Sequence, residues 1–444
     1  MSDLALTKPL TARIVECGGH VDLDAYERAG GYTALGKAVT TMDALSVQTL
    51  VKDAGLRGRG GAGFVAGLKW SFVAIGAKRL PGHTYLVCNA DEMEPGTFKD
   101  RYLMENDPHL LIEGAAIASF AIEADIAYIF LRGDYYQAGD SLDEAVAAAY
   151  AKGYLGKNIF GTGFNLELRV HRSAGRYICG EETALLNALE GKRAQPRTKP
   201  PFPPVSGAWG RPSVVNNCET LCNVPAILRN GIDWYKALGK ATDAGTKLYG
   251  ISGRVNKPGL WELPIGTTMR ELLEVHAGGM QPGRKFKALM PGGASTSFFV
   301  ESELDTPMDF AGVAAAKRRM GTGTMVVIDD TVCPIGLLRN LEHFFAQESC
   351  GFCTPCRDGL PWVEQLLADI DEGRGTPEVM KLLESNANFI GVPGNTFCLH
   401  ATGAIEPLFS AFAQFKDDFE EHIRLGHCPY QKRPPHKHAE ATGR

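Results

Sequence analysis

Apolar and polar residues in the first half of the chain alternate between helical and strand-like spacing. In 46–54 the apolar residues recur at three- and four-residue intervals, and Ser46 precedes them as a candidate N-cap. Asp107 and Pro108 mark the start of another expected helix, and 141–151 predicts a third. Short apolar runs predict strands at 85–88, 126–131 and 166–170. Strands that alternate with helices are typical of a parallel sheet covered by helices, so 65–240 is predicted to be α/β.

The pattern changes in the second half of the chain. Strand-like runs at 248–251, 288–290 and 325–328 are separated by glycine-rich turns, which predicts a small α+β domain. Beyond Pro334 the apolar residues follow helical spacing, with Ile335, Leu338, Leu341 and Phe345 on one face and Leu360, Val363, Leu367 and Ile370 on another. We therefore expect a C-terminal helical bundle, followed at 431–444 by a basic, non-periodic, disordered tail rather than a metal site.

Composition narrows the class of protein. A hydrophobic fraction of 44% is ordinary for globular chains, and a net charge of −5 lacks the basic excess that nucleic-acid binding needs. The N-terminal sequence lacks the order of a signal peptide, and three acidic residues interrupt the longest apolar stretch, at 110–131. No membrane span is expected. Eleven cysteines without an export signal favour a reducing compartment and metal-bound thiolates over disulfides.

Four cysteines have a spacing that indicates an iron–sulfur cluster. Cys350, Cys353 and Cys356 are separated by two residues each, and Cys398 follows at a distance. A [4Fe-4S] cubane takes four thiolates, whereas tetrahedral zinc usually takes two C-x2-C pairs, so the cluster is favoured over zinc and over unrelated buried thiols. Gly351 and Pro355 shape the loop in a way that could direct N–H groups at sulfur. These hydrogen bonds, with the charge of Arg357, would raise the reduction potential.

The remaining cysteines lack any ligand spacing. We expect these cysteines to be buried, apolar thiols. They include Cys17, Cys88, Cys179, Cys218, Cys222, Cys333 and Cys428.

A glycine-rich loop satisfies G-x-G-x-x-G at 58–63, but a predicted helix precedes it, where a dinucleotide-binding fingerprint requires a strand. Five glycines between Gly58 and Gly67 would still let backbone N–H groups approach a phosphate, with Arg57, Arg59 and Lys69 supplying positive charge. The alternative is a flexible surface turn.

Polar turns follow the predicted strands, where open α/β sheets bind their ligands. One is 89–94, which holds Asn89, Asp91, Glu92 and Glu94; two more are at 177–182 and 216–217. The carboxylates of the 89–94 turn suit ribose hydroxyls or ring amides, and 177–182 resembles a second such turn. Glu181 and Glu182 could equally offset the dipole of the helix expected at 183–189, an effect of about 0.3–1 kcal/mol each. A stiff loop at 195–204 carries five prolines and holds Phe202 rigidly.

These segments together resemble the flavin-bearing, NADH-oxidising subunit of respiratory complex I, whose relatives serve NAD-linked hydrogenases and formate dehydrogenases. The resemblance covers about 50–400. It rests on LRGRGGAGF at 56–64, GLKWSF at 67–72, CNADEMEPGTFKDR at 88–101, YICGEETALLNALEG at 177–191, PPFPPVSG at 200–207, VVNNCET at 214–220 and SCGFCTPCRDG at 349–359.

The resemblance implies the domain plan and the cofactors. The expected segments are an N-terminal segment with the glycine-rich loop at 1–64, an atypical Rossmann-like FMN and NADH domain at 65–240, a small ubiquitin-like (SLBB-type) α+β domain at 241–333, a helical bundle with the [4Fe-4S] cluster at 334–430, and the tail at 431–444. FMN would be held by Gly58, Arg59, Gly60, Gly61, Ala62, Gly63, Gly67, Lys69, Asn89, Asp91, Gly180, Asn216 and Asn217.

The resemblance also implies an NADH site beside the flavin. Aromatic contacts would come from Phe64, Phe72 and Phe202, and polar contacts from Glu92, Glu94, Tyr177, Glu181 and Glu182. The cluster ligands would be Cys350, Cys353, Cys356 and Cys398. The sequence departs from the family at Met93, where many members have serine, which affects the geometry expected for Glu94.

NADH releases a two-electron hydride and a [4Fe-4S] centre accepts single electrons, so a flavin is expected between them and no side chain is expected to act as acid or base. The implied partners are a thioredoxin-like [2Fe-2S] subunit and a large multi-cluster iron–sulfur subunit of complex I, on the cytoplasmic side of the bacterial inner membrane. The alternatives are a diaphorase subunit of an NAD-linked hydrogenase or formate dehydrogenase, and a nonenzymatic iron–sulfur or zinc protein. The chain has no second C-x2-C set before 350, which favours complex I over the diaphorase.

Overall fold

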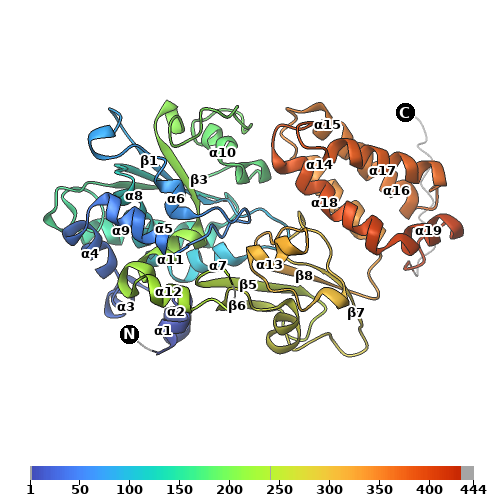
Figure 1. Cartoon of the computed structure of the whole chain (residues 1–444), viewed down its shortest axis with the longest axis horizontal. Coiled ribbons are helices and arrows are strands. Elements are labelled where there is room, and N and C mark those ends of the chain that lie inside the picture. The colour runs from blue at the N-terminus through green and yellow to red at the C-terminus, as the bar shows by residue number, and fades with distance from the viewer. Residues whose placement is uncertain (1–2, 241, 432–444) are drawn as a thin grey trace. The chain divides into compact units, whose positions relative to one another are not determined.

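The alternating segments of the first half fold into a parallel sheet of four strands in the computed structural model (Figure 1). The strands are β1 (Tyr85–Ala90), β2 (Ile126–Leu131), β3 (Glu167–Arg172) and β4 (Ser213–Asn217). Their order is β3-β2-β1-β4, and each neighbouring pair is parallel. The predicted parallel α/β sheet is therefore confirmed, although the sequence predicts only a polar turn where β4 lies.

The structure describes residues 3–240 and 242–431 and divides them into two compact units. The first unit runs to Gly279 and includes Pro291–Gly293 and Ser302–Val326. The second comprises Met280–Met290, Ala294–Glu301 and the chain from Val327 onward. The predicted tail at 431–444 lies outside the described residues except for Gln431.

Alternate residues of β1 pack on opposite faces of the sheet. Leu86, Cys88 and Ala90 belong to the large core that includes the apolar residues of α8 and α11, whereas Val87 packs with Leu185 of α10 on the other face. This arrangement explains why β1 is apolar at nearly every position, since a parallel strand buried on both faces needs no polar alternation. The helices of this region are α7 (Lys99–Asn106), α8 (Pro108–Ala121), α9 (Tyr136–Ala151), α10 (Glu182–Leu189) and α11 (Cys218–Asn230).

Helix starts show how local sequence shapes the first unit. Asp107 accepts a hydrogen bond from Leu110 N and Pro108 is the first residue of α8, as predicted. The helix expected at 46–54 begins earlier, because Asp43 rather than Ser46 is its N-cap. The N-terminal helices are α1 (Asp3–Thr7), α2 (Ala12–Cys17), α3 (Leu23–Arg28), α4 (Thr33–Thr41), α5 (Ala44–Asp53) and α6 (Ala66–Trp70).

The first unit also contains an antiparallel strand pair. Strand β5 (Thr246–Gly253) pairs with β6 (Gly259–Pro264), and β6 was not predicted. Strand β8 (Thr324–Asp329) begins in this unit and ends in the second. The short elements are η1 (Gly76–Lys78), η2 (Ile159–Gly161), η3 (Tyr177–Gly180), η4 (Ala208–Gly210), α12 (Ile232–Ala237), η5 (Glu271–His276), η6 (Glu301–Glu303) and α13 (Phe310–Ala315).

The second unit is mainly helical, with β7 (Phe286–Met290) as a short strand. The apolar faces predicted beyond Pro334 are buried, including Leu338, Phe345, Leu360 and Leu367. Among the described residues of the chain, no helix is both long and apolar enough to cross a membrane. The helices are α14 (Pro334–Glu348), α15 (Thr354–Arg357), α16 (Gly359–Asp371), α17 (Pro377–Gly391), α18 (Leu399–Gln414) and α19 (Lys416–Leu425).

Candidate functional site

The parallel sheet has a topological switch point between β1 and β4. From β1 the chain proceeds to β2 and β3 on one side, whereas β4 lies on the other side. Ligands of open α/β sheets bind in the crevice that forms at the carboxyl ends of the two strands flanking this point. Those ends carry Asn89 of β1 and Asn216 and Asn217 of β4, with Asn89 and Asn217 directly opposite each other. The sheet therefore brings three of the predicted site residues together.

The glycine-rich loop reaches the same edge. It closes on itself, because Gly58 N donates to Phe64 O at 2.8 Å, and it follows helix α5, not a strand. A Cβ placed on Gly60 would lie 3.1 Å from the Cβ of Asn217, so the loop backbone approaches the end of β4 closely. Gly61 has φ +119°, which side-chain-bearing residues rarely adopt. The loop therefore lies against the end of β4, and its part in holding a phosphate stays a prediction.

Buried partners hold the two asparagines of β4. Trp70 Nε1 donates to Asn216 Oδ1 at 2.8 Å, and Asn217 Nδ2 donates to Asp100 Oδ2 at 2.7 Å. Asn217 also caps α11 through Thr220 N. The sequence alone does not single out Trp70 or Asp100, although both lie in segments that carry the family resemblance. Their role is to orient the amides at the edge of the sheet.

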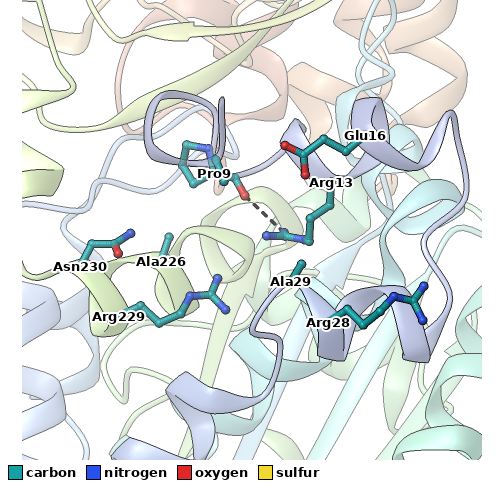
Figure 2. A pocket seen from close by; sticks show the side chains of 9 residues that line it. Pro9, Arg13, Glu16, Arg28, Ala29, Ala226, Arg229 and Asn230 are labelled. Atoms are coloured by element: carbon teal, nitrogen blue, oxygen red, sulfur yellow. Dashed lines mark hydrogen bonds between the residues drawn. The ribbon is translucent and has the colours of Figure 1, made fainter. Parts of the chain in front are cut away.

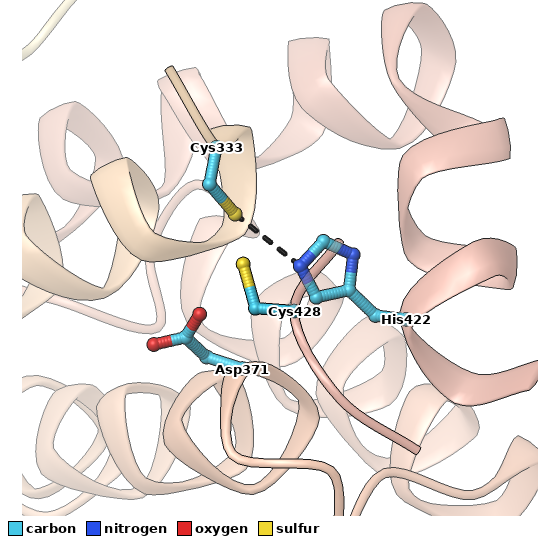
Figure 3. A group of neighbouring side chains, drawn as sticks. All are labelled: Cys333, Asp371, His422 and Cys428. Carbon is cyan, nitrogen blue, oxygen red and sulfur yellow. Dashed lines mark hydrogen bonds between the residues drawn. The ribbon is translucent and has the colours of Figure 1, made fainter. Parts of the chain in front are cut away.

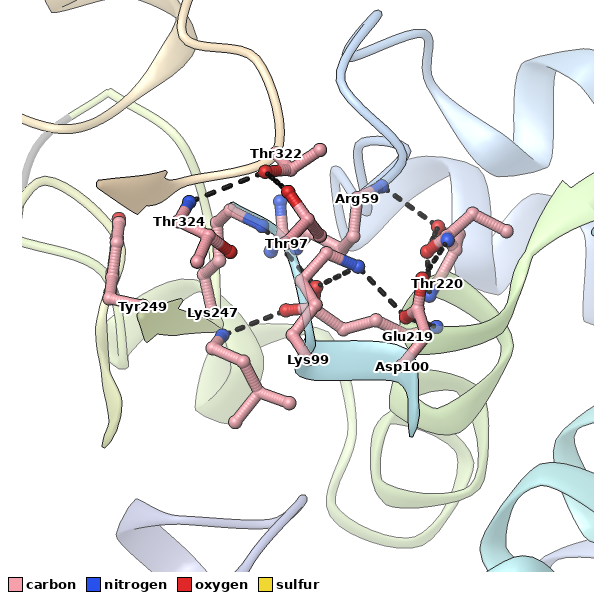
Figure 4. Close-up of polar contacts among 12 residues, drawn as sticks. Arg59, Thr97, Lys99, Asp100, Glu219, Thr220, Lys247, Tyr249, Thr322 and Thr324 are labelled. Carbon is pink, nitrogen blue, oxygen red and sulfur yellow. Dashed lines mark hydrogen bonds and ion pairs between the residues drawn. The ribbon is translucent and has the colours of Figure 1, made fainter. Parts of the chain in front are cut away.

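Asp100, the partner of Asn217, belongs to a buried network of charges (Figure 4). Lys99 Nζ is 2.8 Å from both Asp100 Oδ1 and Glu219 Oε2, and Lys247 Nζ is 3.3 Å from Glu219 Oε2. Burial alone would raise the pKa of Glu219, but Lys247 and Lys99 outweigh it and lower the pKa to about 2. Arg59 is also fully buried and is a third cation in this network, in which the buried Glu92 is a third carboxylate beside Asp100 and Glu219.

We predict that Glu219→Gln destabilises the first unit by about 3–5 kcal/mol, because an amide leaves Lys99 and Lys247 without the carboxylate that both contact. Chemical denaturation of the purified protein would measure the change in the free energy of unfolding. Glu167→Gln is the matched control, since Glu167 pairs with Arg169 at the surface, where such pairs contribute about 0–1 kcal/mol. Equal losses in the two variants would contradict the prediction.

The carboxylate of Glu219 should also make the free energy of unfolding depend on pH. The pKa of Glu219 is lower in the folded chain than its usual value of 4.5, so its stabilising contribution is complete above that value. The contribution is lost as the pH falls from about 4.5 toward about 2. Denaturation curves over this range should show that Glu219→Gln lacks this part of the acid sensitivity.

A cluster of two lysines and two glutamates lies around the start of α10. Lys69 Nζ is 2.6 Å from Glu182 Oε2 and donates to Val215 O at 2.8 Å. Lys199 Nζ is 3.0 Å from Glu181 Oε1 and 3.2 Å from Glu182 Oε1. Glu181 accepts from the N–H groups of Thr183 and Ala184, so it is the N-cap of α10. Glu181 therefore acts at the N-terminus of α10, as the helix-dipole alternative expects. The Glu182 carboxylate instead forms ion pairs with Lys69 and Lys199.

Two predicted site residues point into the protein instead. The Arg59 side chain donates to the carbonyls of Ala244 and Thr246 and so points away from the glycine-rich loop. The backbone of Arg59 is part of that loop. Glu92 accepts from the N–H groups of Asp100 and Arg101 at the start of α7, and burial, with the nearby Asp100 charge, raises its pKa to about 7. Both residues support the surrounding structure, and their contacts to a ligand stay predictions.

Other predicted contacts are open to solvent. Phe64, Phe72 and Phe202 are about half exposed, and the rings of Phe64 and Phe72 lie 6.2 Å apart. Tyr177 OH donates to Glu94 Oε2 at 2.6 Å, so Met93 does not prevent an ordered Glu94. Nothing lies within 4 Å of a Cβ placed on Gly180. These groups present aromatic and polar surface at which a ligand has access.

A cavity of about 220 Å³ lies elsewhere in the first unit (Figure 2). It is lined by residues of the N-terminal helices and by Arg229 and Asn230, at the opposite end of α11 from Asn217. Arg13 is ion-paired with Asp107 at 2.7 Å and donates to Pro9 O. Since this charge is satisfied by the protein, the cavity is not assigned to the ligand at the switch point.

The predicted cluster cysteines lie in the second unit. Cys353 is the N-cap of α15, Cys398 is the N-cap of α18, and Phe397 N donates to Cys353 Sγ at 3.1 Å. Burial is the main cause that raises the pKa of Cys356 to about 11, against a lowering hydrogen bond from Ser349. Cys350 and Cys353 contribute smaller increases, so the three thiols of the loop lie within electrostatic reach of one another. The remote cysteine and the loop are therefore neighbours, as a four-thiolate site requires.

The contacts of this loop change which groups we expect to raise the reduction potential of the cluster. Gly351 has φ +77°, which confirms the unusual backbone angle expected there. An N–H from Phe397, outside the 350–356 loop, reaches the sulfur of Cys353. Arg357 pairs with Asp358 at 3.0 Å, so its charge is largely offset. The hydrogen bond from Phe397 is the better candidate for raising the potential.

Comparison with known families accounts for both units. The profile of the Nuo51 FMN-binding domain matches 51–226, that of the SLBB domain matches 248–299, and that of the NADH-ubiquinone oxidoreductase-F iron-sulfur binding region matches 336–422. Together with the switch-point site and the cysteine loop, these matches define an oxidoreductase that uses FMN and a [4Fe-4S] cluster to oxidise NADH.

The chain belongs to the family of the F subunits of NADH-quinone oxidoreductase. It is 56% identical to the F subunit from Escherichia coli (strain K12) over 94% of this chain and 93% of the relative, and 47% identical to that from Mycobacterium tuberculosis over 92% and 91%. The predicted family, fold class and cofactors are thereby confirmed.

A solved structure provides a further comparison. The chain resembles one from a crystal structure of NAD+-reducing [NiFe]-hydrogenase in the H2-reduced state, with a TM-score of 0.77 and 35% identity. The match covers 90% of this chain but 65% of the hydrogenase chain. The lower identity and shorter coverage make the hydrogenase relative a weaker guide to function than the F subunits of NADH-quinone oxidoreductase.

Proposed function

We propose that FMN is held at the switch point between β1 and β4. The close approach of Gly60 to Asn217 carries this proposal, because glycines in a loop beside the end of β4 leave room for a phosphate next to the loop backbone. Gly58, Gly61, Ala62, Gly63 and Gly67 would shape the loop, and Lys69, Asn89, Asp91, Gly180, Asn216 and the backbone of Arg59 would complete the site.

We propose that NADH is bound beside the flavin. Phe64, Phe72 and Phe202 would stack on its rings, since they are exposed in the chain and apolar rings gain by being covered. Glu94, Tyr177 and Glu182 supply polar contacts, whereas Glu92 and Glu181 act mainly through the helices whose N-termini they bind. Visible spectroscopy of anaerobically purified protein tests this function: bound flavin should bleach on addition of NADH, and protein that shows no flavin band would contradict it.

We propose Cys350, Cys353, Cys356 and Cys398 as the cluster ligands. FMN, when bound, accepts two electrons as a hydride and releases them singly, which suits a one-electron iron–sulfur acceptor. The chain's own contribution is to hold both nucleotides in place and to exclude water with the three phenylalanines. No side chain at the switch point is needed as an acid or base for this reaction.

The acceptor and partners follow from the family by analogy. We propose that electrons pass to a thioredoxin-like [2Fe-2S] subunit and to a large multi-cluster iron–sulfur subunit of complex I, and finally to a quinone. We place the chain peripherally on the cytoplasmic side of the bacterial inner membrane. The hydrogenase-like structure supports a second candidate, a diaphorase subunit. Mass spectrometry of the copurifying chains decides between them, since hydrogenase subunits would support the second.

We predict that the enzyme prefers NADH over NADPH and that Glu182→Gln raises the NADPH-to-NADH ratio of kcat/KM by about ten-fold or more. The two lysines lower the pKa of Glu182 against the effect of burial, so the carboxylate is charged near neutral pH. A charged carboxylate can accept from a ribose 2′-hydroxyl but repels a 2′-phosphate. Steady-state kinetics with both nucleotides would measure the ratio.

Glu181→Gln provides the comparison for this prediction. Its carboxylate caps α10, so removal of its charge should cost mainly helix stability and change the ratio much less. If Glu182→Gln retains FMN and leaves the ratio unchanged, Glu182 has no role in choosing the nucleotide.

A further inference from the structure

Four side chains with metal-binding atoms meet in the second unit, away from the cysteine loop in the sequence (Figure 3). They are Cys333, Asp371, His422 and Cys428, and their ligand atoms all lie within 4.8 Å of one another. Three of the residues are buried and Cys333 is partly buried. The sequence analysis expects both cysteines to be buried apolar thiols; Cys428 is buried and Cys333 is partly buried, and both lie beside polar ligand atoms.

The histidine is oriented as metal-bound histidines are. Its Nδ1 lies 2.6 Å from Asp418 O and therefore carries the proton, since a carbonyl can only accept. Its Nε2 then presents a lone pair to Cys333 Sγ, 3.3 Å away. A hydrogen bond from the outer nitrogen to a backbone carbonyl fixes the tautomer that binds a metal. The ring also stacks on Tyr430, which limits its rotation.

One carboxylate oxygen of Asp371 has no hydrogen-bond partner in the part of the chain that the structure describes and could bind a metal ion. Asp371 Oδ2 lies 3.4 Å from Arg339 Nη1, whereas the buried Oδ1 has no hydrogen-bond partner among the described residues. A buried carboxylate oxygen without a donor is costly, so an unpartnered one points to a missing cation. Arg339 would offset the excess negative charge of two thiolates and a carboxylate around a divalent ion.

Backbone contacts hold the four residues in place from separate elements. Cys333 is the N-cap of α14, Asp371 is the last residue of α16, His422 is in α19, and Cys428 follows α19. A Cβ on Gly373 would lie 2.0 Å from Gly426 O, so the chain segments after α16 and α19 touch at their backbones. This close approach keeps Asp371 near the residues that follow α19.

We propose that Cys333, Asp371, His422 and Cys428 bind one zinc ion as a structural site. Two sulfurs, one imidazole nitrogen and one carboxylate oxygen complete a tetrahedron, and bond lengths of about 2.0–2.3 Å place such ligands about 3.3–3.8 Å apart. The separation of Cys333 Sγ and His422 Nε2 meets this value, and contraction by about 1 Å accommodates the widest pair. Four protein ligands leave no open position, so the ion joins the ends of α16 and α19 to the start of α14.

This site is distinct from the iron–sulfur cluster. Cys333 and Cys428 lie outside the 336–422 segment that matches the iron-sulfur binding region. Ligand atoms within 4.8 Å of one another suit a single ion. A cubane instead offers a separate iron to each cysteine, and therefore needs ligands around a larger object.

The test measures metals in the full-length chain, purified within its complex without chelators. Elemental analysis should show about one zinc per copy of this chain above the zinc in the same complex carrying His422→Ala or Cys428→Ser, while iron per complex stays unchanged. His427→Ala and Cys17→Ser are the matched controls, since both residues are exposed and lie outside the group; they should retain the zinc. Equal zinc in all variants, or no zinc in the wild type, overturns the proposal.

A measurement on the wild type covers the case in which the variants do not fold. Zinc K-edge X-ray absorption of the purified chain should give two sulfur and two nitrogen or oxygen neighbours. A shell of four sulfurs would place zinc in the Cys350 loop instead, and overturns the assignment. Counting the free thiols of the native protein by mass spectrometry is a second test of the site. A disulfide between Cys333 and Cys428 would exclude zinc binding there.

Discussion

Cys398→Ser is expected to reduce the iron content from about four per chain to three or fewer and to change the reduced-state EPR signal. A cubane that loses one of its thiolates tends to lose the iron that the thiolate held. Serine is a good N-cap, so α18 should still begin at this position and the change should act on the cluster rather than on the fold. Iron analysis and EPR of the reduced protein would measure the effect.

The flavin gives this experiment its internal control. The proposed FMN site lies in the first unit, so NADH should still bleach the flavin of the Cys398→Ser protein. Cys17→Ser, at an exposed cysteine of the first unit, should keep all of the iron. Unchanged iron with an unchanged EPR signal in Cys398→Ser would show that another residue is the fourth ligand.

Gly60→Val and Gly61→Val are each expected to abolish the retention of FMN. At Gly60 even a Cβ would stand 3.1 Å from Asn217 Cβ, and the branched side chain of valine would push the loop away from β4. At Gly61 the φ of +119° is a conformation that valine avoids, so the loop would change its path. Flavin content after gel filtration would measure the loss.

A control must distinguish the effect of backbone strain in these variants from damage to the FMN site. Gly153→Val supplies this control, because Gly153 also has a positive φ, of +77°, but lies in open space after α9. It should lower stability and keep its flavin. Full FMN occupancy in both loop variants would show that the glycine loop does not hold the phosphate.

The sequence pattern located the elements whose apolar spacing is regular. Strand β2 has the predicted bounds, and the buried faces of α14 and α16 are those expected from helical periodicity. Three of the four proposed cluster ligands also give a local signal in the sequence, because two residues separate each cysteine of the loop from the next. Strand β6 escaped prediction because Gly259 and Pro264 at its ends resemble turn residues, and its pairing with β5 comes from tertiary structure.

The roles of individual side chains were harder to predict, because residue type does not reveal the direction of a side chain. Glu92 and Arg59 are polar residues in family motifs, yet tertiary packing buries them against backbone groups. Lys199, in the proline-rich loop, became a partner of Glu182 through the fold alone. Cys333 and His422 form one group only because α14 and α19 pack together, and their distance in the sequence carries no spacing signal.

The pairing of Gly60 with Asn217 has a consequence for synthesis of the protein. The loop is made early, but its partner at the end of β4 emerges only after 157 further residues, since 217 − 60 = 157. At about 5–20 residues per second, a ribosome needs about 8–30 s to cover that length. Strand β1 also waits for its neighbour β4, because Tyr85 pairs with Ser213, 128 residues later (213 − 85 = 128). Such non-local pairing slows folding. The proposed FMN site is therefore complete only in a chain translated past the start of α11, so at this site flavin loading would follow most of the synthesis of the first unit.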